Sequence, residues 1–236
     1  MDDSLAQYDE TTSTEAFTLQ NSKLLKVSLR DVTIQSKVGA MVAYQGDVKF
    51  EAAGQGGLGR MLKKAATGEG QTLMKMSGTG EVFLADTAQE IHIIRLEDDK
   101  ITVNGPNLLA FDAGIDWDIE RMQGAGGMMG GGLYNTSLKG TGAVAILSDG
   151  PPVRLDVGSA PTFADPQAAI TWSSGVTTSV KVATGGMRSM LRGGSGESVQ
   201  MAFGGQGWVL VQPSEGRPVP AATGAAQGGL GGLLKG

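Results

Sequence analysis

The chain has 236 residues, of which 38 are glycine, and it carries a net charge of −5. Because it contains no cysteine, disulfides, thiolate nucleophiles and thiolate metal sites are excluded together. The acidic balance and the lack of any long Lys or Arg block disfavour nonspecific nucleic-acid binding, which depends on neutralising phosphates.

The two ends of the chain differ in composition from its body. Residues 1–16 are polar and acidic, and residues 214–236 are rich in Gly and Ala, so we expect both segments to be flexible. The body then forms a single domain over residues 17–213. No signal-like apolar segment opens the chain and no run is long enough to span a bilayer, which predicts a cytoplasmic protein that attaches at most peripherally to the inner face of the membrane.

Apolar residues in the body recur with a period of two. This alternation is found at residues 25–29, 91–93, 101–103, 155–157 and 176–180. Such a pattern is typical of strands with one buried face, and no long helical pattern competes with it. The sequence therefore predicts an all-β fold.

Three similar heptads punctuate these strands. They are GTGEVFL at Gly78–Leu84, GTGAVAI at Gly140–Ile146 and GQGWVLV at Gly205–Val211. In each, two glycines precede an apolar run, as where a tight turn or bulge leads into a buried strand. We expect a body of three pseudo-repeats in which the central valines are equivalent: Val82, Val144 and Val209.

A second recurring feature precedes each heptad. A strand-like run with an early aromatic residue leads into a glycine-rich insert, and the aromatics are Tyr44, Trp117 and Trp172. We expect these three aromatics to occupy comparable strand positions. The inserts cover residues 54–70, 124–134 and 185–196, and nine of the eleven methionines lie in or beside them.

The inserts carry the candidate interaction surface. Apolar residues in the first and third fall at helical spacing with basic residues around them, which predicts short amphipathic helices. Methionine on glycine-hinged loops suits an adaptable contact, and a basic rim suits acidic headgroups or an acidic partner. The alternative is that these helices only cap the β core. The candidate residues are Leu58, Arg60, Met61, Leu62, Lys63, Lys64, Met128, Met129, Met187, Arg188, Met190, Leu191 and Arg192.

Few residues suggest chemistry. His92 is the one histidine, too few for a cupin-like metal site, and it is expected to be a partly buried structural imidazole rather than a catalytic base. The run Glu97–Lys100 is expected to form a hairpin turn. Asp116 and Asp118 alternate around the predicted buried Trp117 and are expected to form a solvated acidic edge. We therefore expect no catalytic residues, no metal site and no cofactor.

Six segments together resemble the bacterial branch of the AIM24 family, formerly a domain of unknown function. The resemblance extends from about Phe17 to Pro213 and is carried by KVGAMVAYQGDVKFE (37–51), the LA that ends the first heptad strand (84–85), NLLAFD (107–112), LKGTGAVAI (138–146), ADPQAAITW (164–172) and FGGQGWVLVQP (203–213). It implies a TRAP-like double-stranded β-helix or sandwich without a known catalytic centre. It also implies kinship with a mitochondrial protein needed for inner-membrane organisation.

Two functions remain in competition on this basis. The first is a non-catalytic scaffold, expected to be a homo-oligomer, that contacts a membrane surface or a protein partner through the inserts. The second is a small-ligand binding module with a pocket near Trp117, Trp172 or Trp208.

Overall fold

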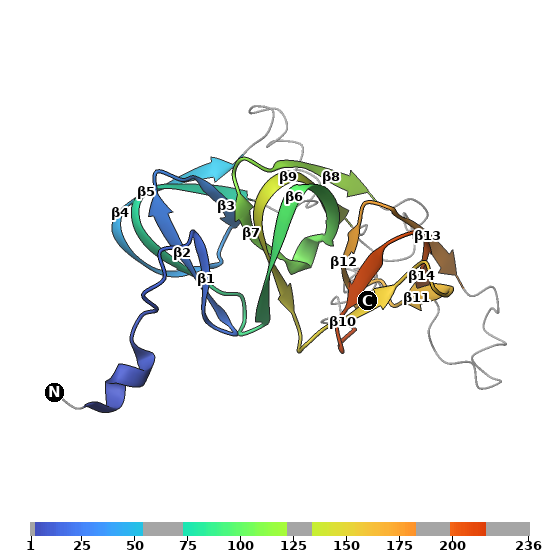
Figure 1. Cartoon of the computed structure of the whole chain (residues 1–236), viewed down its shortest axis with the longest axis horizontal. Helices are drawn as coiled ribbons and strands as arrows, with labels where there is room; N and C mark the ends of the chain where they lie inside the picture. Colours follow the sequence, from blue (N-terminus) through green and yellow to red (C-terminus); the bar gives the residue numbers. More distant parts are fainter. Residues whose placement is uncertain (1–2, 54–72, 122–133, 183–198, 216–236) are drawn as a thin grey trace, which may run out of the picture.

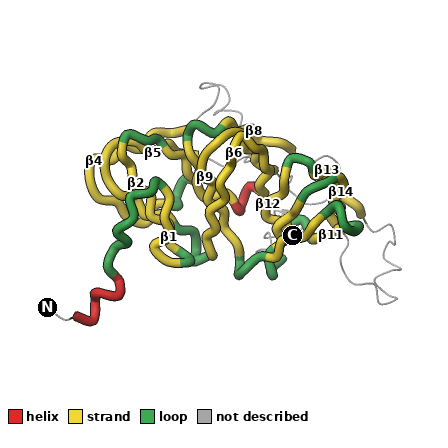
Figure 2. Tube along the Cα trace, viewed as in Figure 1, coloured by secondary structure: helices red, strands yellow, loops and turns green. Residues whose placement is uncertain are grey.

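The computed structural model describes residues 3–53, 73–121, 134–182 and 199–215, and strands dominate that part of the chain (Figures 1 and 2). The helical elements within it are two short 3₁₀ helices, η1 (Asp3–Tyr8) and η2 (Gly105–Asn107). The all-β prediction is confirmed. The predicted helices of the inserts lie outside the described residues.

The strands from β2 to β15 form three units of the same construction. In each unit the last strand in sequence is central, and it pairs antiparallel with an opening strand on one side and a second strand on the other. We call the units unit 1 (residues 24–84), unit 2 (90–148) and unit 3 (153–211). They follow one another along the long axis of the molecule (Figure 1).

Each unit uses its strands in the same roles. In unit 1 the opening strand is β2 (Leu24–Arg30) with β3 (Ile34–Lys37), the second is β4 (Met41–Ala53) and the central is β5 (Leu73–Leu84). In unit 2 these are β6 (Glu90–Asn104), β7 (Leu108–Asp112) with β8 (Asp116–Arg121), and β9 (Tyr134–Ser148). In unit 3 they are β10 (Val153–Asp156) with β11 (Thr162–Ala164), β12 (Ala169–Ser173) with β13 (Val176–Val182), and β14 (Val199–Gly205) with β15 (Trp208–Val211). An additional strand, β1 (Phe17–Asn21), pairs with β2.

The three heptads have the same local backbone. Both glycines of each have positive φ, from +91° at Gly205 to +158° at Gly80. At Gly78 an added Cβ would overlap the carbonyl oxygen of Asp47 on the neighbouring strand β4, so only glycine lets the two strands approach this closely. The valine that follows is fully buried in every heptad, and each valine belongs to a different core cluster: Val82, Val144 and Val209.

The hairpin expected at Glu97–Lys100 is wrong. Strand β6 runs unbroken through this segment, and at a bulge between Leu96 and Asp99 the two residues Glu97 and Asp98 stand opposite the single residue Thr141. Asp98 takes the left-handed conformation, with φ +54°, and its N–H donates to Thr141 Oγ1 at 2.9 Å. The turn-forming tendency of aspartate is thus used to kink a strand opposite the second heptad rather than to end it.

The expected equivalence of Trp117 with Tyr44 and Trp172 is also wrong. Tyr44 pairs with the central valine of unit 1 and Trp172 with that of unit 3, but in unit 2 the partner of the central valine is Phe111. Trp117 lies further along, opposite Leu138. It packs edge to face on Phe111, with 6.3 Å between the ring centroids, and so fills the same core from the next strand segment.

Neighbouring units join by pairing the opening strand of one with the second strand of the next. Unit 1 meets unit 2 where β3 pairs with β7, with Gln35 opposite Phe111. Unit 2 meets unit 3 where β6 pairs with β12, with Thr102 opposite Trp172. The two junctions have the same register. In both, the aromatic residue that pairs with the central valine also faces the middle one of the three paired residues on the opening strand of the preceding unit.

The segment before β1 is attached to unit 1. Lys26, 4% exposed, reaches Glu10 Oε1 and the carbonyl oxygen of Thr11, both at 2.7 Å from its Nζ. Gln20 adds contacts to Asp9 and Thr11. These contacts extend the ordered body upstream of the expected boundary at residue 17, while η1 projects away from the body (Figure 1).

Candidate interaction surfaces

The insert residues predicted to form the interaction surface, from Leu58 to Arg192, all lie outside the described residues. The structure does describe the strands that hold each insert. The last residue pair before the first insert is Ala53 with Leu73, before the second Arg121 with Tyr134, and before the third Val182 with Val199. Each insert therefore connects the second strand of a unit to its central strand.

A first exposed apolar surface lies on β4, at one end of the long axis (Figure 1). Met41, Val42 and Tyr44 occupy the first half of this strand and are 36%, 58% and 49% exposed. Among the described strands β4 pairs with β5 alone. We call residues 41–45 the β4 edge. Phe50, further along the strand, is 37% exposed and packs edge to face on Tyr44.

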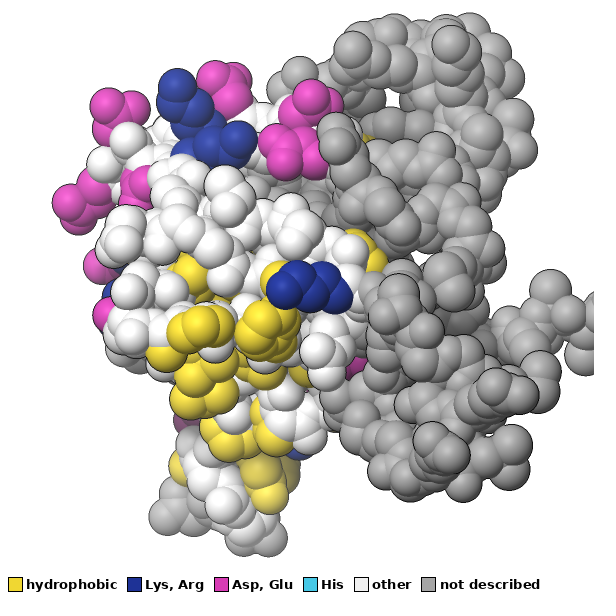
Figure 3. Space-filling model, turned by 90° about the vertical axis from the view of Figure 1, so that its right-hand side faces the viewer, with side chains coloured by type: hydrophobic (Ala, Val, Ile, Leu, Met, Phe, Trp, Pro, Cys, Tyr) yellow, Lys and Arg dark blue, Asp and Glu magenta, His cyan; other side chains and the backbone are white. Residues whose placement is uncertain are grey.

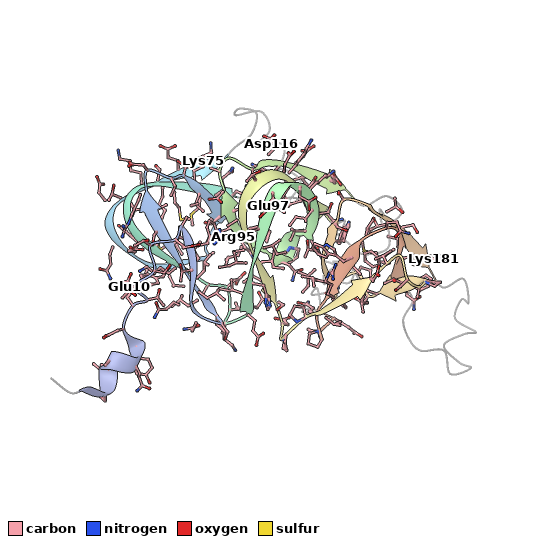
Figure 4. All side chains as sticks on the ribbon, in the orientation of Figure 1. Glu10, Lys75, Arg95, Glu97, Asp116 and Lys181 are labelled. Atoms are coloured by element: carbon pink, nitrogen blue, oxygen red, sulfur yellow. The ribbon has the colours of Figure 1, made fainter. Side chains whose placement is uncertain are left out.

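A second exposed apolar surface lies at the opposite end, on the opening strand of unit 3. Phe163 on β11 is 45% exposed, and Val153 on β10 is 53% exposed. Lys181 Nζ lies 4.8 Å from the centroid of the Phe163 ring, and Figure 4 labels this lysine at that end. Figure 3 views the same end and shows hydrophobic side chains gathered on its described part. Because β11 pairs with β14 alone among the described strands, we call Thr162–Ala164 the β11 edge.

Other strand edges carry charge instead. Asp116 and Asp118 are exposed on β8, which pairs with β9, while Trp117 between them is buried, so the predicted acidic edge is confirmed. The second half of β4 likewise exposes Asp47 and Lys49. Charged side chains discourage a further strand from adding to an edge. The β4 edge lacks this protection.

His92 is partly buried, as predicted. Its Nε2 lies 2.7 Å from Ser148 Oγ, and Ser148 donates its single hydroxyl proton to the carbonyl oxygen of Gly150 at 2.7 Å. The serine must therefore accept from His92 Nε2–H, which is the reverse of what activation of a nucleophile requires. Burial lowers the pKa of His92, against a smaller opposing effect of Glu90.

The lowered pKa of His92 predicts an acid-dependent loss of stability. The unfolded histidine takes up a proton near pH 6.5 and the native one resists it, so stability should fall as the pH drops below 6.5 and level off below the folded pKa. Between pH 7.5 and pH 5.5, the urea midpoint of the wild type should fall further than that of His92→Gln. Equal losses would contradict the effect of burial.

Two of the three tryptophans of the predicted pocket are buried in the core, and the third, Trp208, is partly buried. Trp117 and Trp172 are 8% and 4% exposed, and Trp172 packs edge to face on Phe203 with 5.8 Å between centroids. Trp208 packs against the core cluster that contains Val144, and Arg154 Cζ lies 6.0 Å from the centroid of the Trp208 ring. Ligand binding beside these residues stays a prediction, and no contact described for them favours it.

Among the residues that the structure describes, neither a metal-binding cluster nor a membrane-spanning helix is present. In that part of the chain, no three or more His, Asp or Glu side chains gather as ligands of a metal ion would. None of the helices described there has the length and apolar character needed to cross a membrane.

The fold and its surfaces define a class of all-β proteins in which units of the same construction follow one another and share sheets. A family model described as mitochondrial biogenesis AIM24 matches residues 17–214, and the chain belongs to this family. Among solved structures it is similar to protein SPYM3_0169 from Streptococcus pyogenes, at 22% identity and a TM-score of 0.68, over 84% of this chain and 92% of that one. This likeness shows the fold. No curated protein matches the chain.

Proposed function

We propose that this AIM24-family protein is a non-catalytic scaffold that self-associates and presents its three inserts to a protein partner or a membrane surface. The observation that carries the proposal is the common attachment of the inserts: each leaves and re-enters the body through the same pair of strands of its unit. A frame of like units holding like inserts suits a contact made several times at once.

Self-association is supported by the two ends of the molecule. Soluble proteins seldom leave large apolar side chains on an open strand edge, because such an edge recruits another strand. Here Tyr44 at one end and Phe163 at the other are 49% and 45% exposed. The cytoplasmic location and the peripheral membrane contact expected from the sequence belong to the same proposal.

Vesicle cosedimentation tests the membrane form of the proposal. Reversing the insert charges should reduce binding to vesicles rich in anionic lipid, and added salt should weaken binding by the wild type. The test variant changes Arg60, Lys63, Lys64, Arg188 and Arg192 to Glu. The matched control makes the same charge change at exposed basic residues of the body: Lys23, Arg30, Lys49, Lys75 and Lys139.

The possible results separate the two kinds of partner. Loss of pelleting in the insert variant but not in the control supports membrane contact through the inserts. If the wild type does not pellet, a pull-down with Met61, Leu62, Met190 and Leu191 changed to Ser tests the protein partner. If neither vesicles nor protein partners distinguish the insert variants from the wild type, the proposed role of the inserts is wrong.

A further inference from the structure

Within the described residues, the pairing between units leaves one edge strand at each end of the molecule. Each internal junction joins the opening strand of one unit to the second strand of the next: β3 to β7, then β6 to β12. By this rule β11, in unit 3, lacks a following second strand, and β4, in unit 1, lacks a preceding opening strand. Within the described residues, both of these strands are edges.

The exposed aromatics occupy the positions that the internal junctions bury. Tyr44 corresponds to Phe111 and Trp172, because each pairs with the central valine of its unit. Phe111 is fully buried and Trp172 is 4% exposed, whereas Tyr44 is 49% exposed. Phe163 corresponds to Gln35 and Thr102, which face the two buried aromatics across the internal junctions. Gln35 is 4% exposed and Thr102 is 8% exposed.

A bulge in each second strand gives a second, independent correspondence. The bulged residue is Val42 in β4, Leu109 at the start of β7 and Ile170 in β12. Leu109 of unit 2 packs into the core cluster of unit 1, and Ile170 of unit 3 packs into that of unit 2. Both are fully buried, but Val42 is 58% exposed.

The third core cluster is the one without such a contribution. In the described part of the chain, its members all come from unit 3, with Trp172, Phe203 and Val209 among them. The first and second clusters each include residues of the following unit. Val42 therefore occupies the position of a residue that packs into the core cluster of a neighbouring unit. The cluster of unit 3 is the one that could receive it.

We infer that the β4 edge of one copy pairs with the β11 edge of a second copy and repeats the internal junction between two chains. The register follows from the internal junctions: Tyr44 faces Phe163, Gln45 faces Thr162 and Ala43 faces Ala164. The two edges lie at opposite ends of the long axis (Figure 1), so the contact is head to tail. Such a contact builds a ring if its rotation closes and a filament if it does not.

This inference deepens the self-association part of the proposed function and does not involve the inserts. Since the wild type has no cysteine, single cysteines report the contact cleanly. Residues that face each other in an antiparallel pair have Cα atoms roughly 4.5–5.5 Å apart, which lies within the range a disulfide bridges. We therefore choose Tyr44→Cys and Phe163→Cys, both at exposed positions, where the fold should tolerate the change.

The experiment mixes the two single-cysteine proteins under mild oxidation and resolves the products on a non-reducing gel. Disulfide dimers should form in the mixture, each protein alone should form few, and adding Val42→Glu to the Tyr44→Cys chain should abolish them. Phe50→Cys mixed with Phe163→Cys is the matched control, because Phe50 is exposed on the same strand six residues away. Circular dichroism of every variant checks that it folds.

Absence of cross-linking in the mixture would overturn the inference, and so would equal cross-linking by Tyr44→Cys alone or by the Phe50→Cys control. Sedimentation of the wild type shows whether the protein self-associates at all, and so distinguishes failure of this inference from failure of the scaffold proposal. Association without the Tyr44–Phe163 cross-link would reject the pairing of the β4 and β11 edges and leave the self-association of the proposed function in place.

Discussion

Replacing Gly78 with alanine should lower the free energy of unfolding by about 2–5 kcal/mol, because two costs add. The φ of +116° is unfavourable for any side chain, at roughly 1–2 kcal/mol, and the new Cβ would overlap the carbonyl oxygen of Asp47 on β4. Relieving that overlap means moving a paired strand, which costs about 1–3 kcal/mol by analogy with overpacked cores. Urea unfolding monitored by circular dichroism measures the loss.

Two other glycines separate these costs. Gly39 has a φ of +86° but open space around it, so Gly39→Ala should show the conformational cost alone, about 1–2 kcal/mol. Gly114 has neither a positive φ nor a close neighbour, and Gly114→Ala should be neutral or slightly stabilising. If Gly78→Ala were no worse than Gly39→Ala, the close approach of β4 and β5 would not be a structural constraint.

Truncating Phe111 should be among the most damaging single changes in the core. Phe111 is fully buried and stacks edge to face with Trp117, and large-to-small changes of this kind cost about 3–5 kcal/mol. Tyr44 holds the corresponding position in unit 1 but is half exposed. Tyr44→Ala should therefore cost less than about 1 kcal/mol in dilute protein.

The comparison of these two variants requires dilute conditions, so that contacts between copies do not add to the stability of the wild type. Denaturant midpoints and slopes for both variants and the wild type decide the outcome. A Tyr44→Ala loss as large as that of Phe111→Ala would mean that the β4 edge is covered within a single chain. That result would remove the basis for a contact there.

The features that could be predicted from the sequence are those set by local pattern. The two glycines of each heptad and the valine that follows predict a kinked, buried strand, because both the backbone geometry and the apolar run are local. The alternation of Asp116, Trp117 and Asp118 predicts an edge strand with one buried face for the same reason. Both features are present in the structure.

The errors arose where distant contacts decide between two local possibilities. Aspartate at position 98 suits a hairpin turn and a bulge equally, and the choice depends on Thr141, which lies 43 residues further along the chain. The aromatic of unit 2 presented the same difficulty. Phe111 and Trp117 both fit the pattern, and pairing with β9 rather than composition selects Phe111.

The exposed ends could not be found from the sequence alone. Val42, Leu109 and Ile170 are all apolar residues in strand-like runs, and nothing in their local pattern states whether a further strand covers them. The difference between them lies in the order of the units along the chain. A comparison of the three second strands would have found the correspondence but not the missing partner.

Hydrogen exchange at two protein concentrations tests most directly whether the two ends are contact surfaces for one another. Peptides that cover residues 41–45 and 162–164 should exchange more slowly at high concentration, because strand pairing protects backbone amides. Peptides from the acidic edge strand β8 should exchange at the same rate at both concentrations and serve as the internal control. Slowing at both ends and not at β8 is the result we predict, and exchange that is unchanged with concentration at residues 41–45 and 162–164 would contradict it.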